Sequence, residues 1–315
     1  MTPDGDAMGS SLGLAHTLSA LGKNVYVITP DTPPHSLDVL PGIETIVIAS
    51  RYPEKTRNLL KTSDLIFCLD FNALHRIDRL QSSLEESNGF KVLIDHHPYP
   101  ECFADMIISR PEMSSTCELL YHVLDETGLS KKINKQAAEC IYAGMLTDTG
   151  NFSYNSNNPD IYLIIAELLN KGLNKDEIYE KVWNTNSENR LRICGFALYE
   201  KMELYADLHL SLIVLTKEDL QRFNYVKGDT EGLVNRPLSI PGIYWSVFIR
   251  QDEPDYIKIS MRSKGEFAVN KICEELYGGG GHLNAAGGEF RGSLEEALRL
   301  FKDYISKETI FIKQH

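Results

Sequence analysis

The stretch FKVLIDHHP at residues 90–98 joins an apolar, β-branched run to a carboxylate and two imidazoles. A glycine precedes the run and a proline ends it, a pattern that predicts a short buried strand. Asp95, His96 and His97 would then emerge together at the carboxyl end of that strand. In open parallel sheets this edge binds ligands, and carboxylates and imidazoles are metal ligands. A polar loop with a helix cap is the plainer interpretation of these three residues taken alone.

Other aspartates in the first half occupy comparable positions. Asp70 directly follows the apolar run 64–69, which also predicts a buried strand. Asp4 and Asp6 flank a glycine at the start of a predicted helix that ends near residue 21, where capping requires only one of them. Asp148 follows a predicted helix over 134–146 and is expected on a loop, where a lone aspartate is usually a turn residue. We expect these carboxylates to gather around cations.

Strands and helices alternate through the first half of the chain, which predicts a doubly wound, mainly parallel α/β sheet. From residue 208 onward, strands with alternating apolar residues flank a turn at 251–254 and predict antiparallel pairing in a smaller mixed-sheet α/β domain. The expected domains are 1–184 and 206–315, joined by a helical linker over 185–205. The strands predicted in the first domain cover residues 24–28, 43–48, 64–69, 90–94 and 106–108, and those in the second cover 208–215, 244–249, 256–261 and 288–291.

Two features of the second domain carry chemistry. The strand that ends at residue 261 is followed by Arg262 and Ser263, and a helix over 267–277 leads into a glycine-rich run that contains His282. Such a run is more often a flexible linker. Because it lies here between a helix and a predicted strand, a backbone cradle for a phosphate or carboxylate is the interpretation we favour.

Composition excludes several classes of protein. The 315 residues are 43% hydrophobic and 24% charged, with no apolar run long enough for a membrane helix and no secretory segment, so we expect a cytoplasmic protein without membrane contact. Six scattered cysteines without a Cys-x-x-Cys pair indicate reduced, mostly buried thiols. A net charge of -12 argues against binding of long nucleic acids through a basic surface, although a small phosphorylated ligand remains compatible with it.

Taken in order, these motifs resemble the DHH phosphoesterases that carry a DHH-associated C-terminal domain, and among them the bacterial bifunctional oligoribonucleases and pAp phosphatases. The likeness covers nearly the whole chain, and the ordered set is far more specific than any member. It rests on Pro3-Asp4-Gly5-Asp6, Asp70, Asp95-His96-His97, Asp148, Arg262-Ser263 and the glycine-rich run 278–287.

The resemblance implies a site with two divalent cations in a cleft between the two domains. Its metal ligands would be Asp4, Asp6, Asp70, His96 and Asp148, with Asp70 bridging the two ions. Mixed imidazole and carboxylate ligands suit Mn²⁺, with Mg²⁺ or Co²⁺ as substitutes. Asp95 would orient its neighbours.

The resemblance also implies roles for groups that contact the substrate. His97 would face the substrate phosphate, and His97, Arg262 and Asp70 would be the catalytic residues. Arg262 and His282 would hold phosphate groups, and an arginine can do so with a two-pronged contact. Further substrate contacts would come from Ser263, Gly281 and Asn284.

The activity implied is a metal-dependent phosphodiesterase, an exoribonuclease for very short RNAs and linear dinucleotides, with 3'-phosphatase activity on adenosine 3',5'-bisphosphate (pAp). Cyclic dinucleotides are an alternative substrate, because the motifs do not separate the two. A non-catalytic nucleotide-binding protein is a second alternative. Formation of a homodimer is left open.

One departure from the family pattern concerns the start of the chain. Family members have a strand that ends in a histidine upstream of the position of Pro3, and the sequence contains neither. We therefore expect a shortened form of a longer, active enzyme, in which backbone groups between central strands lack their partners. If the chain really starts at Met1, we expect one metal to bind poorly and the activity to be weak or absent. Reading the gene upstream of Met1 tests this expectation.

Overall fold

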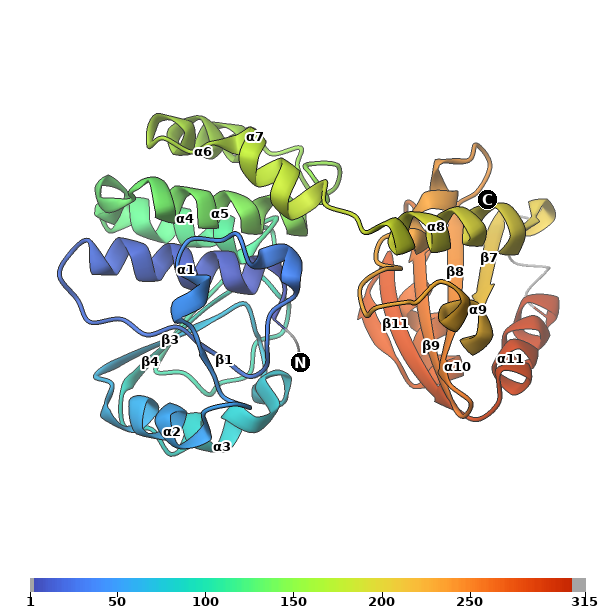
Figure 1. The fold of residues 1–315 in the computed structure, drawn as a ribbon, viewed down its shortest axis with the longest axis horizontal. Coiled ribbons are helices and arrows are strands. Elements are labelled where there is room, and N and C mark those ends of the chain that lie inside the picture. Colours follow the sequence, from blue (N-terminus) through green and yellow to red (C-terminus); the bar gives the residue numbers. More distant parts are fainter. Residues whose placement is uncertain (1–2, 308–315) are drawn as a thin grey trace. The chain divides into compact units, whose positions relative to one another are not determined.

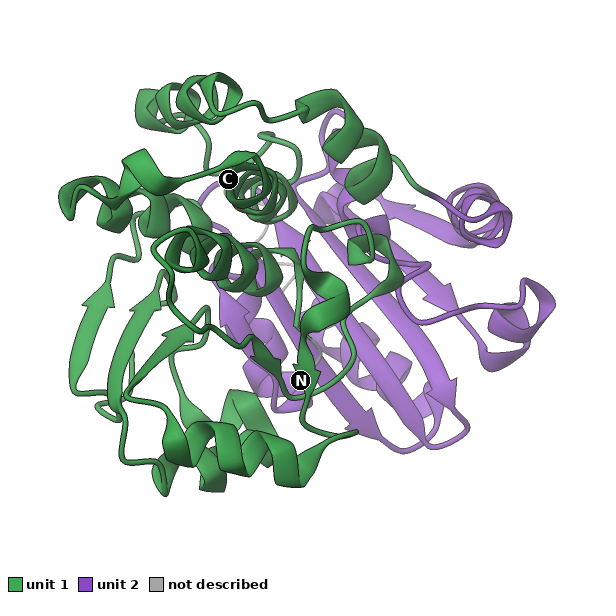
Figure 2. Cartoon of the chain, turned by 60° about the vertical axis from the view of Figure 1, so that its left-hand side comes forward, with its two compact units in different colours: residues 1–185 green, residues 186–315 purple. Residues whose placement is uncertain are grey.

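A computed structural model describes residues 3–307 of the chain. The chain divides into two compact units, residues 1–185 and residues 186–315 (Figure 2). The segment 186–205, which we expected as a linker, belongs to the second unit. Each unit has its own hydrophobic core and is described by itself.

Unit 1 alternates short parallel strands with helices, as the sequence predicts. Its helices and strands are α1 (Gly5–Ser19), β1 (Ile28–Thr29), β2 (Val47–Ile48), α2 (Pro53–Thr62), β3 (Leu65–Leu69), α3 (Gln81–Glu85), β4 (Phe90–Asp95), β5 (Met106–Ser109), α4 (Thr116–Glu126), α5 (Lys135–Asp148), α6 (Pro159–Asn170) and α7 (Lys175–Ile178). Shorter 3₁₀ turns cover His35–Leu37, Ile43–Thr45, Leu74–Leu80 and Leu129–Lys132, and a π-helical turn covers Tyr179–Trp183.

The strands of unit 1 form two parallel sheets. β3, β4 and β5 pair in that order, and β1 pairs with β2. Within residues 3–307, β1 has no second strand partner and β3 pairs only with β4. The strand predicted over 24–28 is wrong in its bounds, since regular pairing covers only Ile28 and Thr29. The parallel α/β class is confirmed.

Helices cover both faces of the three-stranded sheet (Figure 1). On one face, Leu69, Val92 and Ile94 pack with apolar residues of α1, α4 and α5, and α6 and α7 lie outside these helices. On the other face, Cys68 and Leu93 pack with residues of α2 and α3. Successive strand residues point to opposite faces, so burial on both sides explains why β3 and β4 are mainly apolar.

Unit 2 is built on one mixed sheet of six strands in the order β10-β11-β9-β8-β7-β6. Only β7 and β8 are parallel, and β8 and β9 form the predicted antiparallel pair. Its helices and strands are α8 (Glu188–Phe196), β6 (Met202–Tyr205), β7 (Leu210–Leu215), α9 (Lys217–Arg222), β8 (Trp245–Glu253), β9 (Tyr256–Ser263), α10 (Val269–Tyr277), β10 (Gly280–His282), β11 (Ala285–Arg291) and α11 (Leu294–Lys307). A π-helical turn covers Ala197–Lys201, and 3₁₀ turns cover Ala206–Leu208 and Leu233–Ser239.

The two faces of the unit 2 sheet carry separate cores. Trp245, Val247 and Ile259 face α10 and α11. Ile213 and Phe248 face α8, α9 and the 3₁₀ turn Leu233–Ser239. This alternation along each strand produces the regular pattern that predicted the strands from sequence.

The structure can be compared with two expectations from composition, one on membrane helices and one on the state of the cysteines. Within residues 3–307, no helix combines the length and the apolar character that crossing a bilayer requires. The cysteines are all free thiols.

Candidate metal centre

The carboxyl ends of β3 and β4 bring the first site residues together. Asp70 directly follows β3, and its backbone N–H donates to the Ile94 carbonyl of β4 at 3.2 Å. The φ angle of Asp70 is +63°, in the left-handed region that aspartate tolerates better than most residues. His96 and His97 directly follow β4, so the neighbouring strand ends deliver a carboxylate and two imidazoles to one edge of the sheet.

The first turn of α1 supplies two carboxylates with different roles. Asp4 is the N-cap, and its carboxylate accepts the Ala7 N–H at 3.0 Å. Asp6 is only 1% exposed and lies close to His96. Asp4 belongs to neither of the metal-competent groups found among residues 3–307. Its charge nevertheless acts on the other carboxylates.

Asp148 comes from the end of α5. It is the last residue of that helix, so the prediction of a loop position is wrong, because Gly150 (φ +58°) turns the chain only after it. Because α5 packs closely on α1, the carboxylate of Asp148 lies near that of Asp6. A Cβ on Gly9 of α1 would lie 2.6 Å from the Cys140 carbonyl oxygen of α5, so only glycine allows this approach.

His96 lies at the centre of these carboxylates. Its Nε2 is 3.4 Å from Asp148 Oδ2, 3.8 Å from Asp70 Oδ1 and 3.9 Å from Asp6 Oδ2. Its Nδ1 is 3.2 Å from the Met113 carbonyl oxygen, which can only accept a hydrogen bond, so Nδ1 is the donor and Nε2 is the nitrogen that faces the carboxylates. This is the arrangement by which proteins orient a metal-binding histidine.

His97 is oriented by its own neighbour. Its Nδ1 is 2.7 Å from Asp95 Oδ1, and its backbone N–H donates to Asp95 Oδ2 at 3.1 Å. Asp95 is completely buried, so the imidazole is held by a carboxylate that water does not reach. This contact fixes the orientation of the His97 ring.

Burial makes the ionised carboxylates costly when no cation accompanies them. It raises the pKa of Asp6 to about 6, and the charge of Asp4 adds to the effect. Burial, followed by repulsion from Asp6, raises the pKa of Asp148 to about 7. Burial also raises the pKa of Asp70 well above its ordinary value, with repulsion from Asp6 and Asp4 adding to it. A cation at this position would offset all three costs.

The first turn of α4 was not predicted as part of the site. The backbone N–H groups of Thr116 and Cys117 donate to the two carboxylate oxygens of Asp6 at 2.6 and 2.9 Å. The Thr116 hydroxyl donates to Asp70 Oδ1 at 2.9 Å. The Ser-Ser-Thr run at 114–116 signals a helix start, but nothing in the sequence signals which carboxylates that start would bind.

The donor set fits a divalent cation. Two groups of metal-competent atoms occur among the described residues, one from Asp6, His96 and Asp148 and the other from Asp70, His96 and His97, and within each group the atoms lie within 4.8 Å of one another. Carboxylate oxygens with one or two imidazoles suit Mn²⁺ and related ions. Four of the five residues that the sequence predicted as metal ligands therefore lie close together: Asp6, Asp70, His96 and Asp148.

In unit 2, Arg262 and His282 share a row of the sheet. Ala285 of β11 is the register partner of both residues, so their side chains lie on the same face. Asn284 Nδ2 donates to Ser263 Oγ at 2.8 Å and to the Gly265 carbonyl at 2.9 Å. These bonds tie the loop after β9 to the turn before β11.

The glycine-rich run is not a flexible linker, because it forms a helix cap and a strand. Gly278 caps α10 in the left-handed conformation, and residues 280–282 form β10, which pairs with β11. A Cβ on Gly279 would lie 2.1 Å from the Gly287 carbonyl oxygen, and one on Gly281 would lie 2.3 Å from that of Ala285. Close backbone packing therefore accounts for these glycines.

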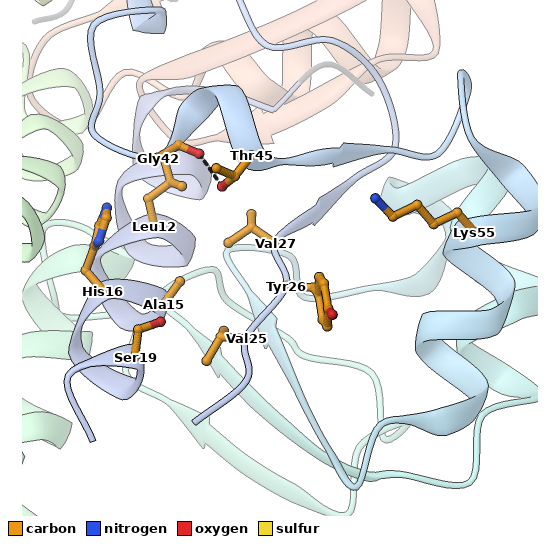
Figure 3. A pocket seen from close by; sticks show the side chains of 10 residues that line it. All are labelled: Leu12, Ala15, His16, Ser19, Val25, Tyr26, Val27, Gly42, Thr45 and Lys55. Carbon is orange, nitrogen blue, oxygen red and sulfur yellow. Dashed lines mark hydrogen bonds between the residues drawn. The ribbon is translucent and has the colours of Figure 1, made fainter. Parts of the chain in front are cut away.

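A pocket of about 220 Å³ lies elsewhere in unit 1 (Figure 3). Leu12 and His16 of α1 line one side of it, Val27 lines another, and Lys55 of α2 lies at its far side. None of the clustered aspartates and histidines lines it. His16 lies ten residues beyond Asp6 on α1, or about 15 Å along the helix, so this pocket is separate from the metal centre.

Buried carboxylates around an imidazole at the carboxyl edge of a parallel sheet, with a second unit on a mixed sheet, define a metal-dependent hydrolase of α/β class. The model of the DHH family, N-terminal domain, matches residues 1–145, and that of the DHHA1 domain matches residues 210–307. The chain belongs to the DHH family of phosphoesterases.

Relatives of the chain extend along most of its length. A solved structure of an exopolyphosphatase-related protein from Bacteroides fragilis has a TM-score of 0.95 and 50% identity, covering 99% of this chain and 92% of that chain. The bifunctional oligoribonuclease and PAP phosphatase NrnA of Thermus thermophilus is 29% identical, over 97% of this chain and 87% of its own length. NrnA of Bacillus subtilis is 28% identical, over 96% and 90% respectively.

A relative with another substrate in its name also aligns with nearly the whole chain. The cyclic-di-AMP phosphodiesterase GdpP of Bacillus subtilis is 26% identical over 97% of this chain, but the match covers only 46% of GdpP. The chain is therefore similar to phosphoesterases whose names give different substrates.

Proposed function

We propose that the protein hydrolyses phosphodiester bonds in very short oligoribonucleotides and linear dinucleotides, and the 3'-phosphate of pAp, with divalent cations held by Asp6, Asp70, His96 and Asp148. The observation that carries the proposal is the placement of three carboxylates within 3.9 Å of His96 Nε2. The likeness to the two NrnA proteins supports this choice of substrates.

The proposed cofactor is a pair of divalent ions, with Mn²⁺ preferred over Mg²⁺ or Co²⁺ because the ligands combine imidazole with carboxylate. When bound, such ions supply Lewis acidity at the phosphoryl group. Asp70 is proposed as the ligand that both ions would share, as the family resemblance implies, and its Oδ1 lies 3.8 Å from His96 Nε2. Asp4 is proposed as an additional ligand, in exchange for its bond to the Ala7 N–H.

His97 is proposed to act at the substrate. Asp95 holds its Nδ1 and orients the ring, so that the imidazole would donate a hydrogen bond to the phosphoryl group or a proton to the leaving oxygen. Arg262 and His282 of unit 2 are proposed to bind substrate phosphate, with Ser263, Gly281 and Asn284 shaping the loop and hairpin that carry them.

Hydrolysis of cyclic dinucleotides is a second candidate, favoured by the likeness to GdpP. The same phosphoryl chemistry would serve both substrates. A comparison of turnover of pApA, pGpG, pAp and cyclic di-AMP in Mn²⁺ separates the candidates. Faster turnover of the linear compounds supports the proposal, and a preference for cyclic di-AMP overturns it.

The role of His96 is tested in the same assay. His96→Ala removes the imidazole at the centre of the cluster, so we expect kcat to fall at least about 100-fold, beyond the usual effect of losing a supporting residue. His35→Ala is the matched control, because the His35 side chain is 95% exposed and pairs with the exposed Asp38. Equal activity of the His96 variant and the control would exclude His96 from the mechanism.

A further inference from the structure

The first turn of α4 contacts two of the proposed metal ligands, which come from different elements. Asp6 lies on α1 and Asp70 follows β3, yet both carboxylates accept hydrogen bonds from Thr116. Thr116 is completely buried, so these bonds do not exchange with solvent. One residue therefore links two carboxylates that are 64 positions apart in the sequence (70 minus 6).

The contact with Asp6 uses the free amides of a helix start. Ser115 is the N-cap of α4, and its hydroxyl accepts the Glu118 N–H at 3.0 Å. The N–H groups of Thr116 and Cys117 have no acceptor within the helix, and each meets one oxygen of Asp6. Both oxygens are thereby fixed, and the positive end of the helix dipole favours the ionised carboxylate.

The contact with Asp70 uses the threonine side chain. The hydroxyl donates to Oδ1, the same oxygen that lies 3.8 Å from His96 Nε2. A β-branched side chain at the start of a helix has few χ1 rotamers, so the hydroxyl is held in place by the backbone. The orientation of the Asp70 carboxylate then follows from the position of α4.

We infer that Thr116 is a positioning residue for metal binding: its amide orients Asp6, its hydroxyl orients Asp70, and together they set the spacing of the two carboxylates. This inference rests on the proposed function, in which both aspartates hold cations. Residues that orient metal ligands through hydrogen bonds typically change metal affinity 10- to 100-fold when they are removed, and we expect about that range for the hydroxyl of Thr116.

The test measures Mn²⁺ binding without substrate, from the electron paramagnetic resonance signal of free Mn²⁺. Thr116→Val keeps the shape and the amide but removes the hydroxyl, and we expect its Kd for Mn²⁺ to rise about 10- to 100-fold. Thr116→Ser keeps the hydroxyl, and we expect its Kd to stay within about threefold of the wild type. If Thr116→Val does not fold, Thr116→Ala takes its place, and we expect the same rise in the Kd for Mn²⁺.

Thr17→Val is the matched control for the loss of a buried threonine hydroxyl. Thr17 is also completely buried in unit 1, and its hydroxyl donates to the Gly13 carbonyl at 2.8 Å, within α1. We expect a loss of thermal stability in EDTA like that of Thr116→Val, but an unchanged Kd for Mn²⁺. A purely structural role for Thr116 would give both variants the same Mn²⁺ affinity.

The outcomes separate this inference from the proposed function. Wild-type affinity for Mn²⁺ in Thr116→Val, with tight binding by the wild type, overturns the inference and leaves the proposed function standing. Weak binding by both Thr116→Val and Thr116→Ser also overturns it, because the hydroxyl alone would not be responsible. A wild-type protein that binds no Mn²⁺ overturns both.

Discussion

At the scale of single residues, burial destabilises the ionised carboxylates of Asp6, Asp70 and Asp148. This effect should appear in the pH dependence of the free energy of unfolding. Asp6 and Asp148 have pKa values raised from 3.8 to about 6 and about 7. Between pH 4 and pH 7 the metal-free folded protein therefore binds more protons than the unfolded chain. Its free energy of unfolding must fall as the pH rises through this window.

Asp148→Asn tests this origin of the pH dependence. The amide cannot ionise, so the decline in stability between pH 5 and pH 7 should become shallower than in the wild type. The measurement is urea unfolding in EDTA at several pH values, repeated with Mn²⁺, which should remove most of the wild-type decline. A stability that rises with pH in this range, or an unchanged slope in the variant, would contradict the account.

The sequence predicted site residues where strand ends determine them. Asp70, His96 and His97 follow buried strands, and a parallel sheet places its strand ends at one edge, so their proximity could be inferred without coordinates. Thr116 could not be inferred, because its bond to Asp6 joins positions 110 residues apart and depends on how α4 packs against α1. Its residue type alone indicates no more than a helix start.

At the scale of elements, the close packing of α1, α4 and α5 brings the carboxylates together. Gly144 of α5 lies where these helices meet: a Cβ there would lie 2.2 Å from Cys117 Sγ and 3.0 Å from Asp6 Oδ1. The sequence gives helical periodicity over α5 but does not reveal which of its small residues faces which neighbour.

Gly144→Ala should destabilise the protein. Overpacking a buried site costs up to about 3 kcal/mol, and alanine recovers about 1 kcal/mol of helix propensity, so we expect a net loss of about 2 kcal/mol in the free energy of unfolding. The matched control is Gly195→Ala in α8, where a Cβ has no heavy atom within 4 Å and should stabilise by up to about 1 kcal/mol. Equal effects of the two substitutions in urea unfolding would exclude a special role for the contact at Gly144.

The fold class was easier to predict from the sequence than the exact bounds of the strands. Strands β3 and β4 were predicted within one residue, because burial on both faces makes them largely apolar. β5 was also predicted within one residue, although Met106 and Ile107 are exposed. The expected strand over 24–28 reduced to Ile28 and Thr29, since pairing depends on a partner and not on local propensity. The glycine-rich run likewise forms a strand, because β11 is available as its pairing partner.

At the scale of the whole molecule, each unit has its own core on both faces of its sheet. The cores around Leu69 and Leu93 lie in unit 1, and those around Trp245 and Phe248 lie in unit 2. The proposed metal ligands all belong to unit 1, and the proposed phosphate ligands Arg262 and His282 belong to unit 2. The proposed cation binding therefore depends on residues of unit 1 and can be measured without substrate.

The most direct test of the central claim is anomalous X-ray scattering at the manganese edge from crystals of the full chain grown with Mn²⁺. The account predicts anomalous peaks bonded to His96 Nε2 and to the carboxylates of Asp6, Asp70 and Asp148. Peaks only at other positions, or none in crystals of protein that hydrolyses a dinucleotide in Mn²⁺, would contradict it.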